Sequence, residues 1–397
     1  MQWFTRLVIM ELLVMLYLFF CKEVWLMKVK GTINASDYIY SVLYKIWLRI
    51  HGAQVGKKVI LCIGCRITAQ HINIGAYTVI GRHVTITANK IRVGENCLFY
   101  AETIVFCNYL FEVGKRSKIS RQCISRANNI QIGKELWCNE QVKIGEGGWN
   151  QSQGNLFIGD HQFIGPRSTI NLSSKVVLKG YGGLGVETAI YTHGAGNGQP
   201  ITEGYYAEQH GVVVGKNVSI LTRAMVMPNI TIQNGVTVAA NAIVTHNVAK
   251  DSLVAGIPAR VIKRSKIRLD SVQRSSLIIN AISEGLGVGG EAINKFNHFW
   301  SGKQDIYYYY YYKGQKVPNF NSILVFFEGS TKLLHDSLMR GGTVIDLKKR
   351  MIQGCTTYTT EKLRDKFRRK GIILSFSDYC PYKLNFNKFL IDHVENP

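Results

Sequence analysis

Aliphatic side chains recur at every sixth position between Val214 and Val248, and this period constrains the fold more than any other feature of the chain. An α-helix would return apolar residues every three or four positions, and an isolated strand would alternate them. A strict period of six is instead the signature of a parallel β-helix, whose stacked coils bury one aliphatic side chain per hexad. Two series follow the period: Val214, Ile220, Val226, Ile232, Val238 and Val244, and four places later Val218, Ala224, Ile230, Val236, Ala242 and Val248.

The same spacing occurs nearer the N-terminus. Residues 74, 80 and 86, and residues 158, 164 and 170, are isoleucines six positions apart, and Gly75, Gly81, Gly159 and Gly165 follow four of them. Glycine tolerates positive φ angles, so we expect these glycines to turn the corners of the coils. Residues 98–127 fit the hexad poorly, which predicts a bulged or looped coil.

Two further stretches carry a resemblance to a known family. The repeat ends with Asp251-Ser-Leu-Val-Ala-Gly-Ile-Pro-Ala-Arg-Val-Ile-Lys263, and Tyr191-Thr192-His193 precedes a polar loop from Gly194 to Gly211. In this order the chain resembles hexapeptide-repeat acyltransferases, in particular galactoside and maltose O-acetyltransferases and bacterial polysaccharide O-acetyltransferases. The resemblance covers roughly residues 50–264. It implies a left-handed parallel β-helix, an acyl-CoA donor and a homotrimer with sites between neighbouring subunits.

The expected fold class is mainly β, in three parts. We predict N-terminal apolar and amphipathic helices in residues 1–50, a left-handed β-helix acyltransferase domain in residues 51–264 and a small α+β domain in residues 265–397. Periodicity predicts an amphipathic helix over residues 37–51. In the third part we expect helices over 269–286 and 360–370, and strands over 306–312, 322–327, 343–352 and 372–376. No motif there indicates a role.

An apolar run from Leu7 to Cys21 is interrupted only by Glu11. It is short for a membrane span, which takes about 20 residues, and it lacks a signal-peptide cleavage pattern. Three interpretations remain open: a helix packed on the trimer or the C-terminal domain, a helix lying in a membrane interface, and a transmembrane anchor.

The formal net charge of +22 predicts attraction to polyanions such as CoA phosphates, nucleotide sugars, anionic glycans or a lipid surface. A basic surface with no dedicated partner is the alternative. Nothing resembles a nucleic-acid-binding module, so we expect no nucleic-acid partner. Nine cysteines include one close pair, Cys62 and Cys65, and no second pair completes a zinc site. We therefore expect structural thiols, no metal, and a cytoplasmic protein that could associate with the inner face of the membrane.

Acyl transfer to a hydroxyl needs a base for the hydroxyl proton and donors for the developing oxyanion. His193 is the candidate base because a histidine pKa lies near neutrality and because it opens the projecting loop. The resemblance implies that Asn171, in the preceding coils, binds the acceptor or positions the reacting groups. A stacking ladder of asparagines is the structural alternative for Asn171.

Substrate contacts are expected in two places. The pantetheine arm of acetyl-CoA needs small side chains and free backbone groups, and the CoA phosphates need cations. Glutamate or histidine side chains near the loop could orient the imidazole or hold sugar hydroxyls. The candidates are Ala239, Ala240 and Asn241 for pantetheine, Arg260, Lys263 and Arg264 for the phosphates, and Glu187, Glu203 and His210 for the acceptor.

These observations predict an acetyl-CoA-dependent O-acetyltransferase that acts on a sugar in bacterial surface-polysaccharide biosynthesis. Three alternatives stay open: N-acylation of an amino-sugar nucleotide, a non-catalytic binding solenoid, and the metal-dependent carbonic-anhydrase branch of this fold. The last requires three converging histidines, for which His161 would have to join His193 and His210.

Overall fold

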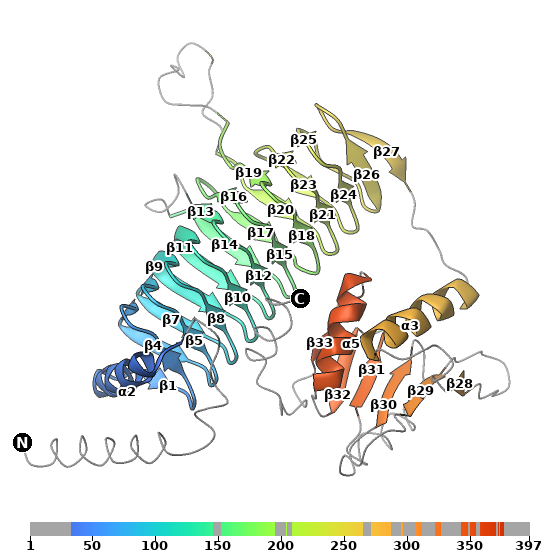
Figure 1. The fold of residues 1–397 in the computed structure, drawn as a ribbon. Helices are drawn as coiled ribbons and strands as arrows, with labels where there is room; N and C mark the ends of the chain where they lie inside the picture. The colour runs from blue at the N-terminus through green and yellow to red at the C-terminus, as the bar shows by residue number, and fades with distance from the viewer. Residues whose placement is uncertain are drawn as a thin grey trace, which may run out of the picture.

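The computed structural model describes residues 33–145, 152–194, 204, 209–264, 271–286, 295–296, 307–311, 322–326, 343–347, 350–354, 358–370, 372 and 374–376. Short parallel strands stack along one axis into a β-solenoid, with a helix at its N-terminal end and a smaller group of helices and strands beside it (Figure 1). The predicted mainly β, hexapeptide-repeat fold is confirmed. The predicted elements within residues 1–32 lie outside the described residues.

Each coil contributes strands to three parallel ladders, which form three faces. Face 1 consists of β1 (Gln54–Val55), β4 (His71–Ile74), β7 (Lys90–Val93), the second halves of β9 (Ile104–Val113) and β11 (Ile124–Ile132), β14 (Asn155–Ile158), β17 (Val176–Leu178), β20 (Val212–Val214) and β23 (Thr231–Ile232). Face 2 consists of β2 (Ile60–Leu61), β5 (Val79–Ile80), β8 (Leu98–Phe99), β10 (Lys118–Ile119), β12 (Trp137–Cys138), β15 (Phe163–Ile164), β18 (Gly183–Leu184), β21 (Ser219–Ile220), β24 (Thr237–Val238) and β26 (Ser252–Ala255), with β27 (Arg260–Arg264) antiparallel at its end. Face 3 consists of β3 (Arg66–Thr68), β6 (Thr85–Thr87), the first halves of β9 and β11, β13 (Lys143–Gly145), β16 (Thr169–Asn171), β19 (Ala189–Ile190), β22 (Met225–Val226) and β25 (Ile243–Val244).

The chain turns a corner between successive faces, so each coil has three corners. We call the turn from face 1 to face 2 the first corner, which includes Arg116 and Glu135. The second corner, from face 2 to face 3, includes Glu187, and the third, from face 3 back to face 1, includes Asn171 and His193. All twelve residues of the two hexad series are buried, with at most 5% of their surface exposed. The period of six in the sequence therefore identifies residues of the buried core.

Gly75, Gly81, Gly159 and Gly165 do not turn the corners through positive φ angles, so this expectation is wrong for them, whereas Gly145 after Ile144 does have a positive φ of 114°. Gly94 avoids a steric clash instead: a Cβ there would lie 2.5 Å from the backbone nitrogen of Lys115 on the next coil. The positive φ angle falls two residues later, on Asn96 (55°), and on Arg116 (62°) and Glu135 (60°) in the next two coils. Glycine is selected here by the close approach of coils.

The coil that fits the hexad poorly is bulged, as predicted. β9 and β11 run through the third corner as continuous strands, and their pairing shifts register between Ala127 and Asn129. The amide of Asn108 donates to Oδ1 of Asn128 at 2.5 Å across this corner. The ladder resumes at Asn129 opposite Leu110, shifted by one residue from the pairing of Ala127 with Cys107, because β9 carries one extra residue at this corner.

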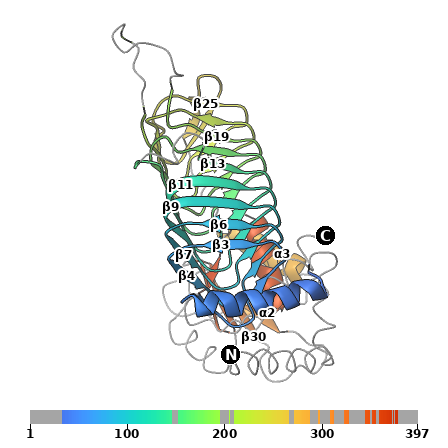
Figure 2. The ribbon, with the colours of Figure 1, turned by 90° about the vertical axis from the view of Figure 1, so that its left-hand side faces the viewer.

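α2 (Ala35–Ile50) is the predicted amphipathic helix, and it closes the N-terminal end of the solenoid (Figure 2). An end coil leaves backbone groups without a neighbouring strand. Side chains of α2 replace that strand: Ser41 Oγ accepts from the Leu61 amide at 3.0 Å, and Tyr44 Oη accepts from the Ile67 amide at 2.9 Å. Asp37, fully buried, accepts from the Ile63 amide at 3.0 Å and pairs with Arg82. Hydrogen bonding as well as packing therefore fixes α2.

The C-terminal elements form the predicted α+β arrangement. They comprise α3 (Ser271–Leu286), β28 (Lys295–Phe296), β29 (Tyr307–Tyr311), β30 (Ser322–Phe326), β31 (Thr343–Asp346), β32 (Met351–Gly354), α5 (Tyr358–Arg369) and β33 (Ser375–Phe376), with the six strands in sheet order. The single strand predicted over residues 343–352 is wrong. β31 and β32 pair antiparallel, Thr343 opposite Gly354, because the chain reverses before Met351 through Arg350 at φ 55°.

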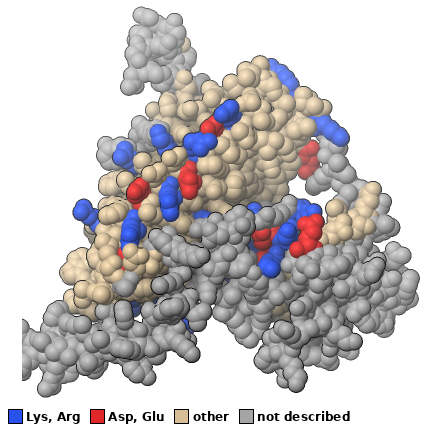
Figure 3. Space-filling model, in the orientation of Figure 1, with Lys and Arg blue, Asp and Glu red and all other residues tan. Residues whose placement is uncertain are grey.

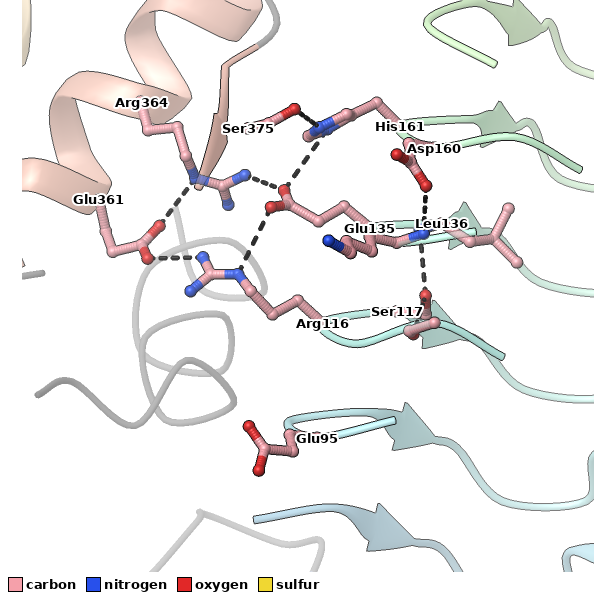
Figure 4. Close-up of polar contacts among 12 residues, drawn as sticks. Glu95, Arg116, Ser117, Glu135, Leu136, Asp160, His161, Glu361, Arg364 and Ser375 are labelled. Atoms are coloured by element: carbon pink, nitrogen blue, oxygen red, sulfur yellow. Dashed lines mark hydrogen bonds and ion pairs between the residues drawn. The ribbon is translucent and has the colours of Figure 1, made fainter. Parts of the chain in front are cut away.

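A buried charge network joins these C-terminal elements to the first corner (Figure 4). We use this name for Arg116, Glu135, His161, Glu361 and Arg364. Arg116 Nη2 lies 2.6 Å from Glu361 Oε1 with both side chains 1% exposed, and Arg364 bridges Glu361 (2.9 Å) and Glu135. His161 Nδ1 lies 3.6 Å from Glu135, and its Nε2 lies 2.5 Å from the hydroxyl of Ser375 on β33. Contacts between residues far apart in sequence thus fix α5 and β33 against the solenoid.

The formal charges of this network balance, because it contains two arginines and two glutamates. Burial alone would raise the pKa of Glu135, but Arg364 and Arg116 beside it hold that pKa below its usual value. Burial lowers the pKa of His161, against the opposing effect of Glu135. The imidazole is therefore neutral at neutral pH, and protonating it would add an uncompensated buried charge.

Basic and acidic side chains lie together in rows along the coils on the face shown in Figure 3.

The six cysteines of the described coils are all buried, and burial raises the pKa of Cys62 and Cys65 to about 12. This environment agrees with structural thiols. No helix in the described part of the chain is both long and apolar enough to cross a bilayer.

Candidate functional site

His193 lies on the third corner, which follows β19. An isolated antiparallel bridge pairs it with Gln209, and the His210 amide donates to the Thr192 carbonyl at 3.0 Å. The two ends of the loop predicted from Gly194 to Gly211 therefore meet beside His193. Residues 195–203 and 205–208 of the loop, including Glu203, lie outside the described residues. His210 is exposed on the segment that returns to β20, and its backbone hydrogen bond is to Thr192, the residue before His193.

Asn171 lies one coil before His193 on the same corner, since Ile170 pairs with Ile190. Its Oδ1 atom accepts hydrogen bonds from the Ser173 amide at 3.1 Å and from the Thr192 hydroxyl at 2.7 Å. The same oxygen lies 3.0 Å from Nδ1 of His193. Asn171 and Thr192 are buried, at 3% and 0% exposure, while the His193 side chain is half-buried. The structure therefore brings the two predicted catalytic residues into direct contact.

This contact fixes the tautomer of His193. A backbone amide donates to Oδ1 of Asn171, so that atom is the carbonyl oxygen of the side-chain amide and can only accept. Nδ1 of His193 must then carry the hydrogen and donate it. The neutral ring keeps its lone pair on Nε2, which is the nitrogen able to take a proton from a substrate. This arrangement equips an imidazole as a general base.

Sequence reasoning missed Ser173 and Thr192, which hold Asn171 in place. Thr192 Oγ1 accepts from the Ser174 amide at 3.0 Å, so its own hydrogen points to Asn171. Ser173 Oγ lies 3.2 Å from Nδ1 of His193. The available signal was their position: Ser173 is two residues after Asn171, and Thr192 directly precedes His193, so all share one corner of adjacent coils.

The structure does not bring Glu187 to His193 within one chain. Glu187 lies on the second corner, where its two carboxylate oxygens accept from Arg223 Nε at 2.6 Å and Arg167 Nε at 2.9 Å. These hydrogen bonds lower its pKa, that from Arg223 having the larger effect. A spacing of six residues from His193 places Glu187 one corner earlier, because each hexad covers one face.

The residues expected at the CoA site lie on the second corner and at the end of the solenoid. Ala240 and Asn241 are exposed, but the amides of Ala239 and Asn241 donate to Val254 and Thr222 on adjacent coils, at 2.9 and 3.0 Å. The backbone amides of Ala239 and Asn241 are therefore not among the free backbone groups expected at this site. Parallel ladders use these groups. Arg260 and Lys263 are exposed on β27, which Arg264 ends.

Two other features lie away from His193. His161 is on the first corner, within the charge network, so it does not converge with His193 and His210. Among the described residues no group of three or more His, Cys, Asp or Glu side chains could hold a metal ion. A shallow groove of about 750 Å³ runs over face 1 toward the first corner, past Arg92, Lys115 and Lys134, and does not include the His193 corner.

Comparisons with known proteins agree with the predicted relatives. No protein-family model matches the chain. The chain is 28% identical over 177 residues to a dTDP-4-amino-4,6-dideoxy-D-glucose acyltransferase of Escherichia coli, covering 42% of this chain and 90% of that protein. It is 27% identical over 158 residues to a putative colanic acid biosynthesis acetyltransferase, WcaF, of E. coli K12, covering 37% of this chain and 79% of that protein.

These relatives confirm the predicted resemblance and support an acyltransferase. A shorter match, 37% identical over 57 residues, is to the putative lipopolysaccharide biosynthesis O-acetyl transferase WbbJ of E. coli K12, over 14% of this chain and 29% of that protein. Among solved structures, similar chains include a maltose O-acetyltransferase from Clostridium difficile 630, at 18% identity and a TM-score of 0.25, covering 41% of this chain and 70% of that chain. Another is a UDP-N-acetylglucosamine acyltransferase from Campylobacter jejuni, at 14% identity and a TM-score of 0.30, covering 60% of this chain and 82% of that chain.

Proposed function

We propose that the chain is an acetyl-CoA-dependent O-acetyltransferase acting on a sugar hydroxyl in bacterial surface-polysaccharide biosynthesis. The observation that carries this proposal is the hydrogen bond from Nδ1 of His193 to Oδ1 of Asn171, which leaves Nε2 as the basic nitrogen. Sugar acyltransferases among the relatives support the acceptor class.

In the proposed reaction Nε2 of His193 removes the proton of the acceptor hydroxyl as its oxygen attacks the thioester carbonyl. The tetrahedral intermediate collapses by breaking the carbon–sulfur bond, and the imidazolium returns the proton to the departing CoA sulfur. Asn171 acts as a positioning residue: its carbonyl oxygen accepts from Nδ1–H and stabilises the imidazolium that forms during transfer. Ser173 and Thr192 hold this asparagine.

Donor binding is proposed at the second corner and β27. Ala239, Ala240 and Asn241 would contact pantetheine, and Arg260, Lys263 and Arg264 would contact the CoA phosphates. These residues and His193 lie on different corners of one chain, which fits the homotrimer implied by the resemblance, with each site completed by a neighbour. Glu187 and His210 remain proposed acceptor contacts, and a cytoplasmic location remains a prediction.

N-acylation of an amino-sugar nucleotide is a second candidate, favoured by the relative that matches over 90% of its own length. The test incubates the purified protein with acetyl-CoA and a panel of oligosaccharides, sugar nucleotides and amino-sugar nucleotides, and identifies products by mass. Mild alkali then cleaves an ester product and leaves an amide intact. An alkali-labile product supports the proposal. A stable amide would replace it with the N-acyltransferase, and no product with any acceptor would favour a non-catalytic solenoid.

A further inference from the structure

α2 presents an exposed apolar stripe on the side facing away from the solenoid. We use "α2 stripe" for Ile39, Leu43, Trp47 and Ile50, which are 49%, 55%, 50% and 61% exposed. Their spacing of four, four and three residues places them along one line of the helix. Leu48, on the packed side, is 1% exposed. Scattered exposed hydrophobic residues are normal, but a contiguous row marks an interaction surface.

The α2 stripe is held rigidly in position. The hydrogen bonds from Leu61 and Ile67 to α2 side chains fix the helix across the end of the solenoid (Figure 2). The Trp47 ring packs against the rings of Tyr44, at 5.8 Å, and His51, at 4.3 Å. A partner therefore meets a preformed surface, so binding does not have to order these side chains.

The sequence on either side indicates what this surface contacts. Residues 7–21 contain one charged side chain, Glu11. The four residues of the α2 stripe could cover only part of so many apolar side chains, whereas a bilayer accommodates them all. Lys22, Lys28 and Lys30 precede α2 in the sequence. Within α2, Lys45 and Arg49 donate instead to the carbonyls of Val59 and Val55 on the first coil, each at 3.0 Å.

We propose that the α2 stripe docks on an anionic lipid bilayer surface. An amphipathic helix with an aromatic and aliphatic face and flanking cations suits the boundary between headgroups and acyl chains. Basic residues near such a surface are attracted by anionic headgroups. The indole of Trp47 belongs to a residue type enriched at this depth. The α2 stripe is separate from the proposed acetyl-transfer site. It lies at the N-terminal end of the solenoid, whereas Asn171 and His193 lie on later coils.

The test is co-sedimentation of the full chain with vesicles of phosphatidylcholine plus phosphatidylglycerol, and with vesicles of phosphatidylcholine alone. The variant Leu43→Ser/Ile50→Ser alters the stripe, and Ile104→Ser/Leu221→Ser is the matched control, since these side chains are 39% and 43% exposed on other faces. The expected result is preferential binding to the anionic vesicles and an apparent Kd raised about tenfold or more by the stripe variant only. All four side chains are exposed, so thermal unfolding should report intact folds.

Three outcomes would overturn the proposal. The unaltered chain could fail to sediment with anionic vesicles, or the stripe variant could bind as tightly as the unaltered chain. The stripe variant could also lower the molar mass in lipid-free solution by light scattering, which would assign the stripe to a second copy of the chain. Acetyltransferase activity enters none of these readouts, so failure of the proposed function would leave this test unaffected.

Discussion

Removing one member of the charge network should weaken the attachment of the C-terminal elements strongly, and removing a matched pair should restore most of it. Glu361→Gln leaves Arg116, Arg364 and Glu135 with a net positive charge in a buried site. Breaking a buried ion pair by removing one partner costs about 3 kcal/mol or more. Arg116→Met should cost a similar amount, because it leaves the opposite excess. The double variant keeps only Arg364 and Glu135, whose charges cancel.

Hydrogen exchange of the α5 amides measures this effect, because local openings of a unit have their own free energy. Each single variant should speed exchange of α5 by about 150-fold, which is the equivalent of 3 kcal/mol. The double variant should cost much less than the sum of the singles, with a coupling energy of about 2 kcal/mol or more. Amides of α2, which closes the N-terminal end of the solenoid and does not contact the charge network, are the internal control.

Additive single effects, or single variants that exchange like the unaltered chain, would refute the reasoning. Additivity would mean that Arg116 and Glu361 act independently despite the 2.6 Å contact. Unchanged exchange would mean that the contact does not persist in solution.

Three further predictions follow from single sites. Burial lowers the pKa of His161 in the folded chain, so the unfolded chain binds more protons just below the usual histidine pKa. Protection of the α5 and β33 amides from hydrogen exchange should therefore fall as pH drops below about 6.5. The variant His161→Gln should remove that pH dependence. Asn171→Ala should lower kcat by about 10- to 100-fold with little change in KM, whereas Asn171→Gln should not rescue it because the longer side chain misplaces the carbonyl oxygen; steady-state kinetics would detect either departure. Gly94→Ala would place a Cβ 2.5 Å from the Lys115 nitrogen and should destabilise the coils by about 1–3 kcal/mol, seen as a lower Tm; an unchanged Tm would contradict the close-approach explanation.

The sequence predicted the solenoid because its stabilising contacts are local and periodic. A coil returns to the same face after three hexads, so an inward Ile220 or Val238 can be identified without knowing any distant partner. The same arithmetic could have placed Glu187 one corner before His193. The contact of Asn171 with His193 was also within reach, since one coil and an insertion separate them.

The attachment of the C-terminal elements could not be predicted in this way. Arg116 and Glu361 are 245 positions apart, and no repeat relates them. The positive φ angles at Arg116 and Glu135 aim charged side chains outward from a corner, where a sequence interpretation expects solvent. Only the packed structure shows that α5 supplies the matching charges.

The most direct test of the central claim is the rate of acetyl transfer to the identified acceptor by the purified chain and by His193→Gln. His246→Gln is the matched control, because His246 is an exposed histidine two coils further along the same corner. Loss of a general base predicts a fall in kcat of about 100-fold or more for His193→Gln, with the His246 variant unaffected and both variants folded. Equal turnover by the chain and its His193→Gln variant would contradict the account.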